Sequence, residues 1–166
     1  MSETSVHKVL VSACLLGQPV RYDGQSKGIV SDWLRELGAE GRALAFCPEV
    51  AGGLPTPRPP AERQGERVVT ASGLDVTAEF ARGAALALAT CQQQGIRFAL
   101  LKEGSPSCGS GRIYNGRIYN GRFEGQSVAG EGMTTALLRR HGIAVFSEDQ
   151  LPELASALAS AACGSV

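Results

Sequence analysis

The segment Val9-Leu-Val-Ser-Ala-Cys-Leu-Leu-Gly17 contains a short apolar run that ends in a cysteine. An apolar run of this length, bounded by turn-forming residues, is typical of a buried strand. The same pattern recurs in Ala43-Leu-Ala-Phe-Cys47 and in Phe98-Ala-Leu-Leu101, the latter followed after a short loop by Cys108. In a parallel sheet the carboxyl ends of the strands meet at one edge, where such folds bind ligands. The sequence therefore predicts that the three cysteines share a site at that edge.

Segments with apolar residues at helical spacing alternate with these strands. Ile29, Trp33, Leu34 and Leu37 predict a short helix that ends at Gly38. Further helices are expected at 76–95, at 133–141 and from 151 onward, a fourth strand at 143–146, and a proline-rich loop at 48–60. The repeated β-then-α order predicts an α/β fold with a mostly parallel sheet flanked by helices, in a Rossmann-like three-layer arrangement. The length fits a single domain over residues 1–166.

The composition and charge of the chain argue against several classes of function. The 16 basic and 16 acidic residues form no long run of one sign, which does not favour binding to nucleic acid or to an anionic membrane. No apolar stretch approaches the roughly 18 residues of a membrane span, and residues 1–8 lack the hydrophobic segment of a signal peptide. We therefore expect a cytoplasmic protein, a monomer or a homodimer, whose partner is a small molecule.

The five cysteines are expected to be reduced, because an odd number spread through an ordinary composition does not indicate a disulfide framework. Taken singly, Cys14, Cys47 and Cys108 each fit a buried structural thiol. Together, at three strand ends, they fit ligands of a soft metal or of an iron–sulfur cluster with one coordination position left open. Cys91 lies on the apolar stripe of a predicted helix and is expected in the core, whereas Cys163 is assigned no role.

The loops beside these cysteines carry groups suited to proton transfer and to substrate binding. Glu49 lies two residues after a cysteine, where it fits either a general acid–base group or a solvated loop carboxylate. The segment Ser105-Pro-Ser-Cys-Gly-Ser-Gly111 offers hydroxyls and N–H groups that can hold an anion, although a plain turn has the same composition. Asp23 follows the first strand and Lys102 ends the third, so both are expected near the same edge.

A set of motifs spreads over nearly the whole chain, and their combination is far more specific than any one of them. The motifs are Val11-Ser-Ala-Cys-Leu-Leu-Gly17, Arg21-Tyr-Asp-Gly24, Cys47-Pro-Glu-Val-Ala-Gly-Gly-Leu54, Pro57-Arg-Pro59, Leu101-Lys102, Ser105-Pro-Ser-Cys-Gly109 and Gly142-Ile-Ala-Val-Phe-Ser147. Together they resemble the thiouracil desulfidase family, formerly catalogued as a bacterial domain of unknown function. The resemblance implies removal of sulfur from a thiolated uracil by means of a [4Fe-4S] cluster held by Cys14, Cys47 and Cys108. It further implies that Glu49 and Ser105 assist catalysis, with Ser107 as the alternative to Ser105.

These observations predict an iron–sulfur-dependent desulfidase that releases sulfide from a thiolated nucleobase or a similar small thiocarbonyl compound. In this hypothesis Glu49 activates water or moves a proton, Ser105 or Lys102 orients the ring, and Asp23, Lys102 and Ser107 form the substrate-binding set. One alternative is a desulfurase for another thiolated small molecule or a sulfur-donating step. Another, from a different class, is a non-catalytic redox sensor that binds zinc or an oxygen-labile cluster.

A duplicated unit follows the third cysteine. Arg112-Ile-Tyr-Asn-Gly116 is repeated at once as Arg117-Ile-Tyr-Asn-Gly121. The resemblance to the family implies a single copy of this unit. The unit is too short for a repeat architecture. We expect the second copy to bulge outward, because loops accommodate insertions at a modest entropic cost. Tyr114 and Tyr119 can stack on a planar ring if they line the mouth of the site.

Overall fold

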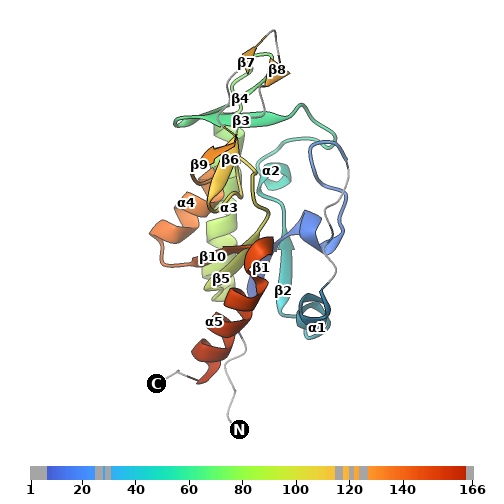
Figure 1. The fold of residues 1–166 in the computed structure, drawn as a ribbon, viewed down its shortest axis with the longest axis vertical. Helices are drawn as coiled ribbons and strands as arrows, with labels where there is room; N and C mark the ends of the chain where they lie inside the picture. Colours follow the sequence, from blue (N-terminus) through green and yellow to red (C-terminus); the bar gives the residue numbers. More distant parts are fainter. Residues whose placement is uncertain are drawn as a thin grey trace.

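A four-stranded parallel sheet in the order β10-β5-β1-β2 forms the centre of the fold (Figure 1). The computed structural model describes residues 7–24, 28, 31–114, 118–119, 122–123 and 127–163. The four strands are β1 (Val9–Ser12), β2 (Ala43–Phe46), β5 (Phe98–Leu101) and β10 (Ala144–Ser147). In the register of the sheet, Val9 aligns with Ala43 on one side and with Phe98 on the other. Each strand lies where the apolar runs of the sequence predict one.

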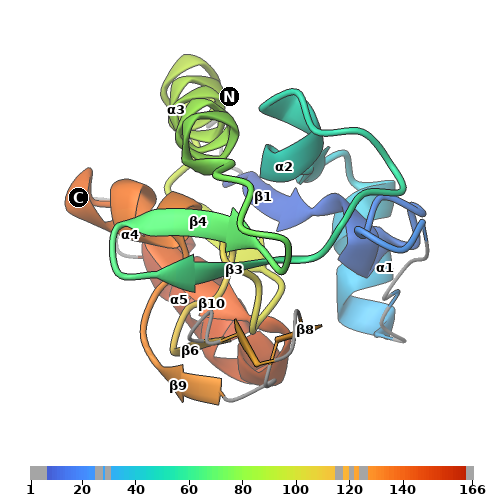
Figure 2. The same cartoon turned by 90° about the horizontal axis from the view of Figure 1, so that it is seen from above.

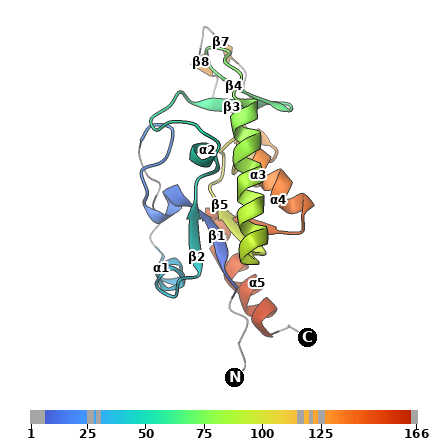
Figure 3. The ribbon, with the colours of Figure 1, turned by 180° about the vertical axis from the view of Figure 1, so that it is seen from behind.

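Helices pack on both faces of this sheet. One face carries α3 (Thr77–Gln94) and α4 (Met133–Arg140), and the other carries α1 (Asp32–Ala39) and α5 (Leu151–Cys163) (Figure 3). Successive side chains of a strand point to opposite faces. Accordingly, Leu10 packs in the core under α3 and α4, whereas Val9 and Val11 pack in the core under α1 and α5. The arrangement confirms the predicted α/β fold with a mostly parallel, helix-flanked sheet.

Cys91 belongs to α3 and packs in the core, as its place on the apolar stripe predicts. Its side chain is fully buried, in a cluster that also contains Ala87, Leu101 and Leu138. Burial raises the pKa of the Cys91 thiol to about 11. A neutral thiol in such surroundings behaves as a small hydrophobic group. Cys91 therefore contributes packing and does not face the edge where the other cysteines lie.

The proline-rich segment after β2 begins with a one-turn helix, α2 (Pro48–Ala51), where the sequence predicts a loop over residues 48–60. Proline suits the first turn of a helix because the N–H that it lacks has no partner there. Two glycines then let this helix touch α3. A Cβ on Gly83 would collide with the carbonyl oxygen of Pro48, and a Cβ on Gly52 would collide with that of Glu79. The two backbones are in direct contact, which requires glycine at both positions.

Six short strands form three antiparallel pairs that the sequence analysis does not predict. They are β3 (Ala61–Gln64) with β4 (Arg67–Thr70), β6 (Arg112–Tyr114) with β9 (Ser127–Ala129), and β7 (Ile118–Tyr119) with β8 (Arg122–Phe123). Figure 2, which views the molecule from above, shows β3 and β4 side by side across the middle of the picture. In Figure 1, β7 and β8 stand apart from the parallel sheet. The rest of the second repeat copy lies outside the described residues, so its expected outward bulge stays a prediction.

The remaining short elements connect the strands to the helices. The 3₁₀ helix η1 (Ala13–Leu16) follows β1, and η2 (Glu148–Gln150) joins β10 to α5. Helix α1 begins at Asp32 because the Ser31 side chain accepts a hydrogen bond from the N–H of Leu34 at 3.1 Å. Ile29, placed in this helix by its spacing, lies outside the described residues. Among the helices that the structure describes, none is both long and apolar enough to cross a membrane.

Candidate functional site

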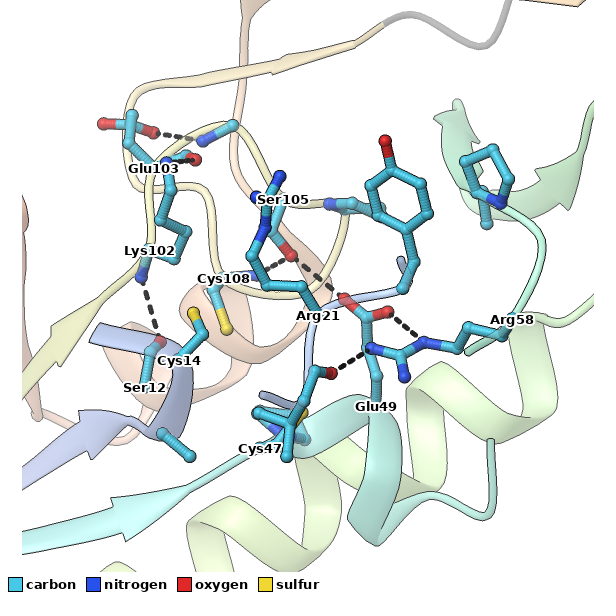
Figure 4. A pocket seen from close by; sticks show the side chains of 18 of the residues that line it. Ser12, Cys14, Arg21, Cys47, Glu49, Arg58, Lys102, Glu103, Ser105 and Cys108 are labelled. Carbon is cyan, nitrogen blue, oxygen red and sulfur yellow. Dashed lines mark hydrogen bonds and ion pairs between the residues drawn. The ribbon is translucent and has the colours of Figure 1, made fainter. Parts of the chain in front are cut away.

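A cavity of about 570 Å³ lies at the edge of the sheet where β1, β2 and β5 end (Figure 4). Cys14, Cys47 and Cys108 all line it. The three cysteines are separated by long stretches of sequence, and the parallel topology brings them together as their strand-end positions predict. They are free thiols.

Each of the three cysteines is held at the cavity by a different kind of local structure. Cys14 lies in η1, one turn after β1, and Cys47 is the residue that precedes the first turn of α2. Cys108 lies in the loop after β5, and its carbonyl oxygen accepts a hydrogen bond from the hydroxyl of Thr135 at 2.9 Å. A Cβ on Gly132 would collide with the backbone of Ser107, so the start of α4 packs tightly on this loop. Two of the three ligand candidates therefore depend on contacts with helices α3 and α4.

The surroundings of the three thiols disfavour their charged thiolate forms. Burial raises the pKa of Cys14 to about 11, and the nearby Cys47 adds to the rise. Burial also raises the pKa of Cys47. It raises the pKa of Cys108 to about 12, with a hydrogen bond from Ser12 acting in the opposite direction. Without a metal these thiols are protonated at neutral pH, and ligation of a metal would release their protons.

The donor set of three thiols fits an iron–sulfur cluster. Across the described part of the chain, no group of three or more His, Cys, Asp or Glu side chains could hold one metal ion. Thiolates are the preferred ligands of iron–sulfur clusters. Three thiols around one open cavity could hold such a cluster, which would keep one iron without a protein ligand.

Glu49 and Ser105 face each other across the cavity. The hydroxyl of Ser105 donates to Oε2 of Glu49 at 3.3 Å. The same oxygen of Ser105 accepts hydrogen bonds from the backbone N–H groups of Ser107 and Cys108, both at 3.1 Å. The two N–H groups fix the Ser105 oxygen and leave its proton directed at the carboxylate. The pair is thus arranged for proton transfer next to the three thiols.

The other oxygen of Glu49 pairs with an arginine that the sequence analysis does not assign to the site. Nε of Arg58 donates to Oε1 of Glu49 at 3.1 Å, and the side chains of the two residues are 4% and 18% exposed. Arg58 belongs to one of the motifs that carry the family resemblance. Its pairing with a residue nine positions earlier depends on how the proline-rich segment folds back, which the spacing alone does not give.

Lys102 lies at the cavity wall but has partners of its own. Its Nζ pairs with Oε2 of Glu148 at 2.8 Å and donates to the carbonyl oxygen of Glu103 at 2.9 Å. The backbone N–H of Lys102 donates to the hydroxyl of Ser12 at 2.9 Å. The ammonium group is therefore held in a fixed position beside the thiols (Figure 4).

Glu103 organises the loop that carries Cys108. Its carboxylate accepts hydrogen bonds from the N–H groups of Gly104, Ser110, Gly111 and Arg112 and from the hydroxyl of Ser110, at 2.8 to 3.2 Å. Burial acts to raise the pKa of Glu103, but the N–H groups outweigh it and hold this pKa below the ordinary value. The sequence left open whether the N–H groups of this loop form an anion-holding nest or a plain turn, and in the structure they hold a carboxylate of the chain itself.

Two residues of the predicted substrate-binding set are not among the described residues that line the cavity. Ser107 is fully buried, and its hydroxyl hydrogen bonds to that of Thr134 at 2.7 Å. Asp23 lies outside the lining and approaches the guanidinium of Arg21 at 3.8 Å. Of the two serines left open by the sequence, Ser105 is the one whose side chain reaches Glu49.

Aromatic and cationic residues at the wall of the cavity extend the predicted site. Arg21, Tyr22 and Tyr114 line it, and each tyrosine is 40% exposed. The guanidinium of Arg21 lies over the Tyr22 ring, 5.8 Å from the ring centre. Half-exposed rings offer flat faces on which a planar heterocycle can stack. The side chain of Tyr119, the second tyrosine of the duplicated unit, lies outside the described residues.

Comparison with known proteins gives the class to which this fold and site belong. The family model of 2-thiouracil desulfurase matches residues 9–150. The chain therefore belongs to the 2-thiouracil desulfurase family, and the family predicted from the sequence motifs is confirmed. The chain is also 42% identical over 156 residues to the uncharacterized protein YbbK of Bacillus subtilis (strain 168). That match covers 88% of this chain and 99% of YbbK.

A particular solved structure resembles this chain throughout. It is the [4Fe-4S]-dependent thiouracil desulfidase TudS, which is 84% identical to this chain and superposes with a TM-score of 0.87. The match covers 92% of this chain and 98% of TudS. At this identity the comparison supports both the fold and the iron–sulfur cofactor expected for the three cysteines.

Proposed function

We propose that this protein is a [4Fe-4S]-dependent desulfidase that hydrolyses the thiocarbonyl group of a thiolated uracil and releases sulfide. The observation that carries the proposal is the Glu49–Ser105 pair in a cavity that three cysteines line. Membership of the 2-thiouracil desulfurase family and the similarity to TudS support it.

Cys14, Cys47 and Cys108 would hold the cluster. When bound, the cluster supplies one iron without a protein ligand, which is a Lewis-acid site for a soft sulfur atom. The reaction replaces the C=S bond of the substrate by a C=O bond. Water provides the oxygen, its two protons leave with the sulfur as hydrogen sulfide, and no electrons are exchanged.

Glu49 and Ser105 move the protons of this reaction. The Glu49 carboxylate can accept a proton from the attacking water through the oxygen that now faces Ser105. The Ser105 hydroxyl, fixed by two backbone N–H groups, can then orient either the water or a polar edge of the ring. Lys102 faces the same space with a localised positive charge, which suits a carbonyl oxygen of the ring.

Asp23 and Ser107 act on the substrate indirectly in this proposal. Asp23 approaches Arg21 at 3.8 Å, so it can set the direction of a guanidinium that lines the cavity. Ser107 holds the Cys108 loop against α4 through its hydrogen bond to Thr134. Both residues shape the pocket from outside its wall.

We infer further that the substrate is a free small molecule, that the protein acts in the cytoplasm, and that it is a monomer or a homodimer. The formal net charge of zero supports a small-molecule substrate over a nucleic acid. Analytical ultracentrifugation of the cluster-loaded protein and fractionation of the source cells test the last two inferences.

The deciding experiment is anaerobic purification followed by three measurements: iron and sulfide content, the visible absorption spectrum, and turnover of 2-thiouracil. The proposal expects a cluster and the formation of uracil and sulfide. A protein that carries a cluster but releases no sulfide from any thiolated base would instead be a sensor or a binding module.

A further inference from the structure

A buried arginine next to the proton-transfer pair has a role that the proposed mechanism has not yet used. Arg58 as a whole residue is 8% exposed. Among the residues that the structure describes, it is the only charged one that is buried. Burying a guanidinium is costly unless paired groups replace its water. The arginine is therefore tied to specific partners.

All three side-chain nitrogens of Arg58 donate hydrogen bonds. Nε binds Oε1 of Glu49 at 3.1 Å, and Nη2 binds the carbonyl oxygen of Val20 at 2.9 Å. Nη1 binds the carbonyl oxygen of Pro55 and the hydroxyl of Thr56, both at 3.0 Å. Several independent anchors therefore fix the guanidinium, and its direction does not depend on Glu49.

Those anchors come from the walls of the cavity. The backbone N–H of Arg58 donates to the carbonyl oxygen of Tyr22 at 2.7 Å, so Arg58 ties the proline-rich segment to the loop after β1. Val20 and Tyr22 of that loop line the cavity together with Arg58. The side chain of Arg58 is thus held by hydrogen bonds to two segments of the cavity wall. Glu49 projects from the one-turn helix α2 beside it (Figure 4).

The two oxygens of Glu49 consequently have different tasks. Arg58 occupies Oε1, and the remaining oxygen, Oε2, receives the Ser105 hydroxyl at 3.3 Å. A glutamate has three rotatable side-chain bonds, and without the arginine its carboxylate would be free to turn toward water. Pairing one oxygen with a fixed guanidinium selects the orientation in which the other meets Ser105.

We propose that Arg58 is a positioning residue that holds the Glu49 carboxylate within hydrogen-bond distance of the Ser105 hydroxyl. The inference rests on the proposed desulfidase function in one respect: the Glu49–Ser105 pair that Arg58 aligns serves that reaction. Arg58 itself touches neither substrate nor cluster in this scheme. It acts through Glu49.

A double-mutant cycle with Arg58→Met and Glu49→Gln tests this dependence in the cluster-loaded enzyme. Arg58→Met should lower kcat by about 100-fold, the loss typical of a displaced catalytic group, with iron content and the absorption spectrum unchanged. In the Glu49→Gln background it should lower kcat by no more than about twofold, because the group that it positions is already gone. Additive losses would overturn the proposal, because they would show that Arg58 acts apart from Glu49.

Two further variants separate positioning from general packing. Thr56→Val removes one anchor of Arg58 and leaves its bond to Glu49, so kcat should stay within about twofold of wild type. Arg58→Lys keeps a positive charge near Glu49 and should recover part of the kcat that Arg58→Met loses. It also provides the same cycle if Arg58→Met does not fold. A Thr56→Val loss as large as that of Arg58→Met, or no recovery by lysine, would contradict the proposal.

A readout without the cluster keeps this inference distinct from the proposed function. Crystal structures of the cluster-free proteins should show the Glu49 carboxylate within hydrogen-bond distance of Ser105 in wild type and turned away in Arg58→Met. An unmoved carboxylate refutes the positioning role, whatever the enzyme acts on. A displaced carboxylate in Arg58→Met, found together with a cluster-loaded wild-type protein that does not turn over thiouracil, upholds the positioning role and refutes the proposed function.

Discussion

Replacing Glu103 by glutamine should weaken the loop that presents Cys108. The carboxylate receives five hydrogen bonds, four of them from backbone N–H groups of residues 104 and 110–112. Hydrogen bonds to a charged acceptor contribute about 1.5 to 3 kcal/mol each, against about 1 kcal/mol for neutral ones. Glutamine keeps one acceptor oxygen and loses the charge. Because the five bonds share one partly exposed group, we expect a net loss of about 2 kcal/mol of unfolding free energy.

In a chain of this length a loss of that size lowers the melting temperature by about 4 to 8 °C. Thermal unfolding of the cluster-free protein at neutral pH measures it. Glu66→Gln is the matched control, because Glu66 is exposed in the turn between β3 and β4. The melting temperature of this control should equal that of wild type.

The pH dependence gives the same prediction a second test. The N–H groups around Glu103 hold its pKa below the ordinary value of 4.5, against the opposing effect of burial. The folded state thus favours the carboxylate. The resulting stabilisation is complete above pH 4.5 and is lost as the pH falls through the lowered value. The difference between wild type and Glu103→Gln should therefore shrink in acid. A difference that persists undiminished, or a variant as stable as wild type at neutral pH, would refute this account of the loop.

Three further outcomes test the site and the insertion. Cys14→Ser should abolish the cluster, whereas Cys91→Ala should keep full iron and sulfide content, because Cys91 lies in the core; equal iron loss in both would contradict the ligand assignment. Glu49→Gln should keep the cluster spectrum and slow sulfide release by about 100-fold, and unchanged turnover would make Glu49 a structural residue. Deleting residues 117–121 should change the unfolding free energy by only tenths of a kcal/mol, about 1 °C in melting temperature. Any effect should appear in substrate affinity, and a large loss of melting temperature would show that β7 is packed structure.

The sequence predicts the parallel sheet well because its signals are local. Apolar runs such as Val9–Ser12 and the helical stripe that contains Cys91 report burial directly. The shared cavity of the three cysteines follows from the same runs, since strand direction alone gathers their ends. The helix at Pro48–Ala51 and the short antiparallel pairs are different, because tertiary contacts stabilise them rather than a repeating pattern. For example, α2 depends on the contact between Pro48 and Gly83.

The partners of the site residues could be predicted less well than the residues themselves. Glu49 and Ser105 stand beside cysteines in the sequence, and their positions suggest chemistry. Arg58 reaches Glu49 only because the proline-rich segment folds back on itself, and nothing in the spacing of the two residues specifies that path. The anion-holding character of the Cys108 loop was predictable from its glycines and serines, but its occupant, Glu103, precedes the loop and carries no motif.

Helix α3 contributes no cysteine to the cavity and yet sets the spacing of two of them. At one side its backbone meets α2 through Gly52 and Gly83, directly after Cys47. It also packs against α4, whose Thr135 holds the carbonyl oxygen of Cys108. Exchanging Gly83 for alanine would force the contact between α2 and α3 to open, because the added Cβ would collide with the carbonyl oxygen of Pro48, the residue next to Cys47. The ability to bind a cluster of fixed size thus depends partly on how closely α2 approaches α3. That distance is set by Gly83, which does not line the cavity.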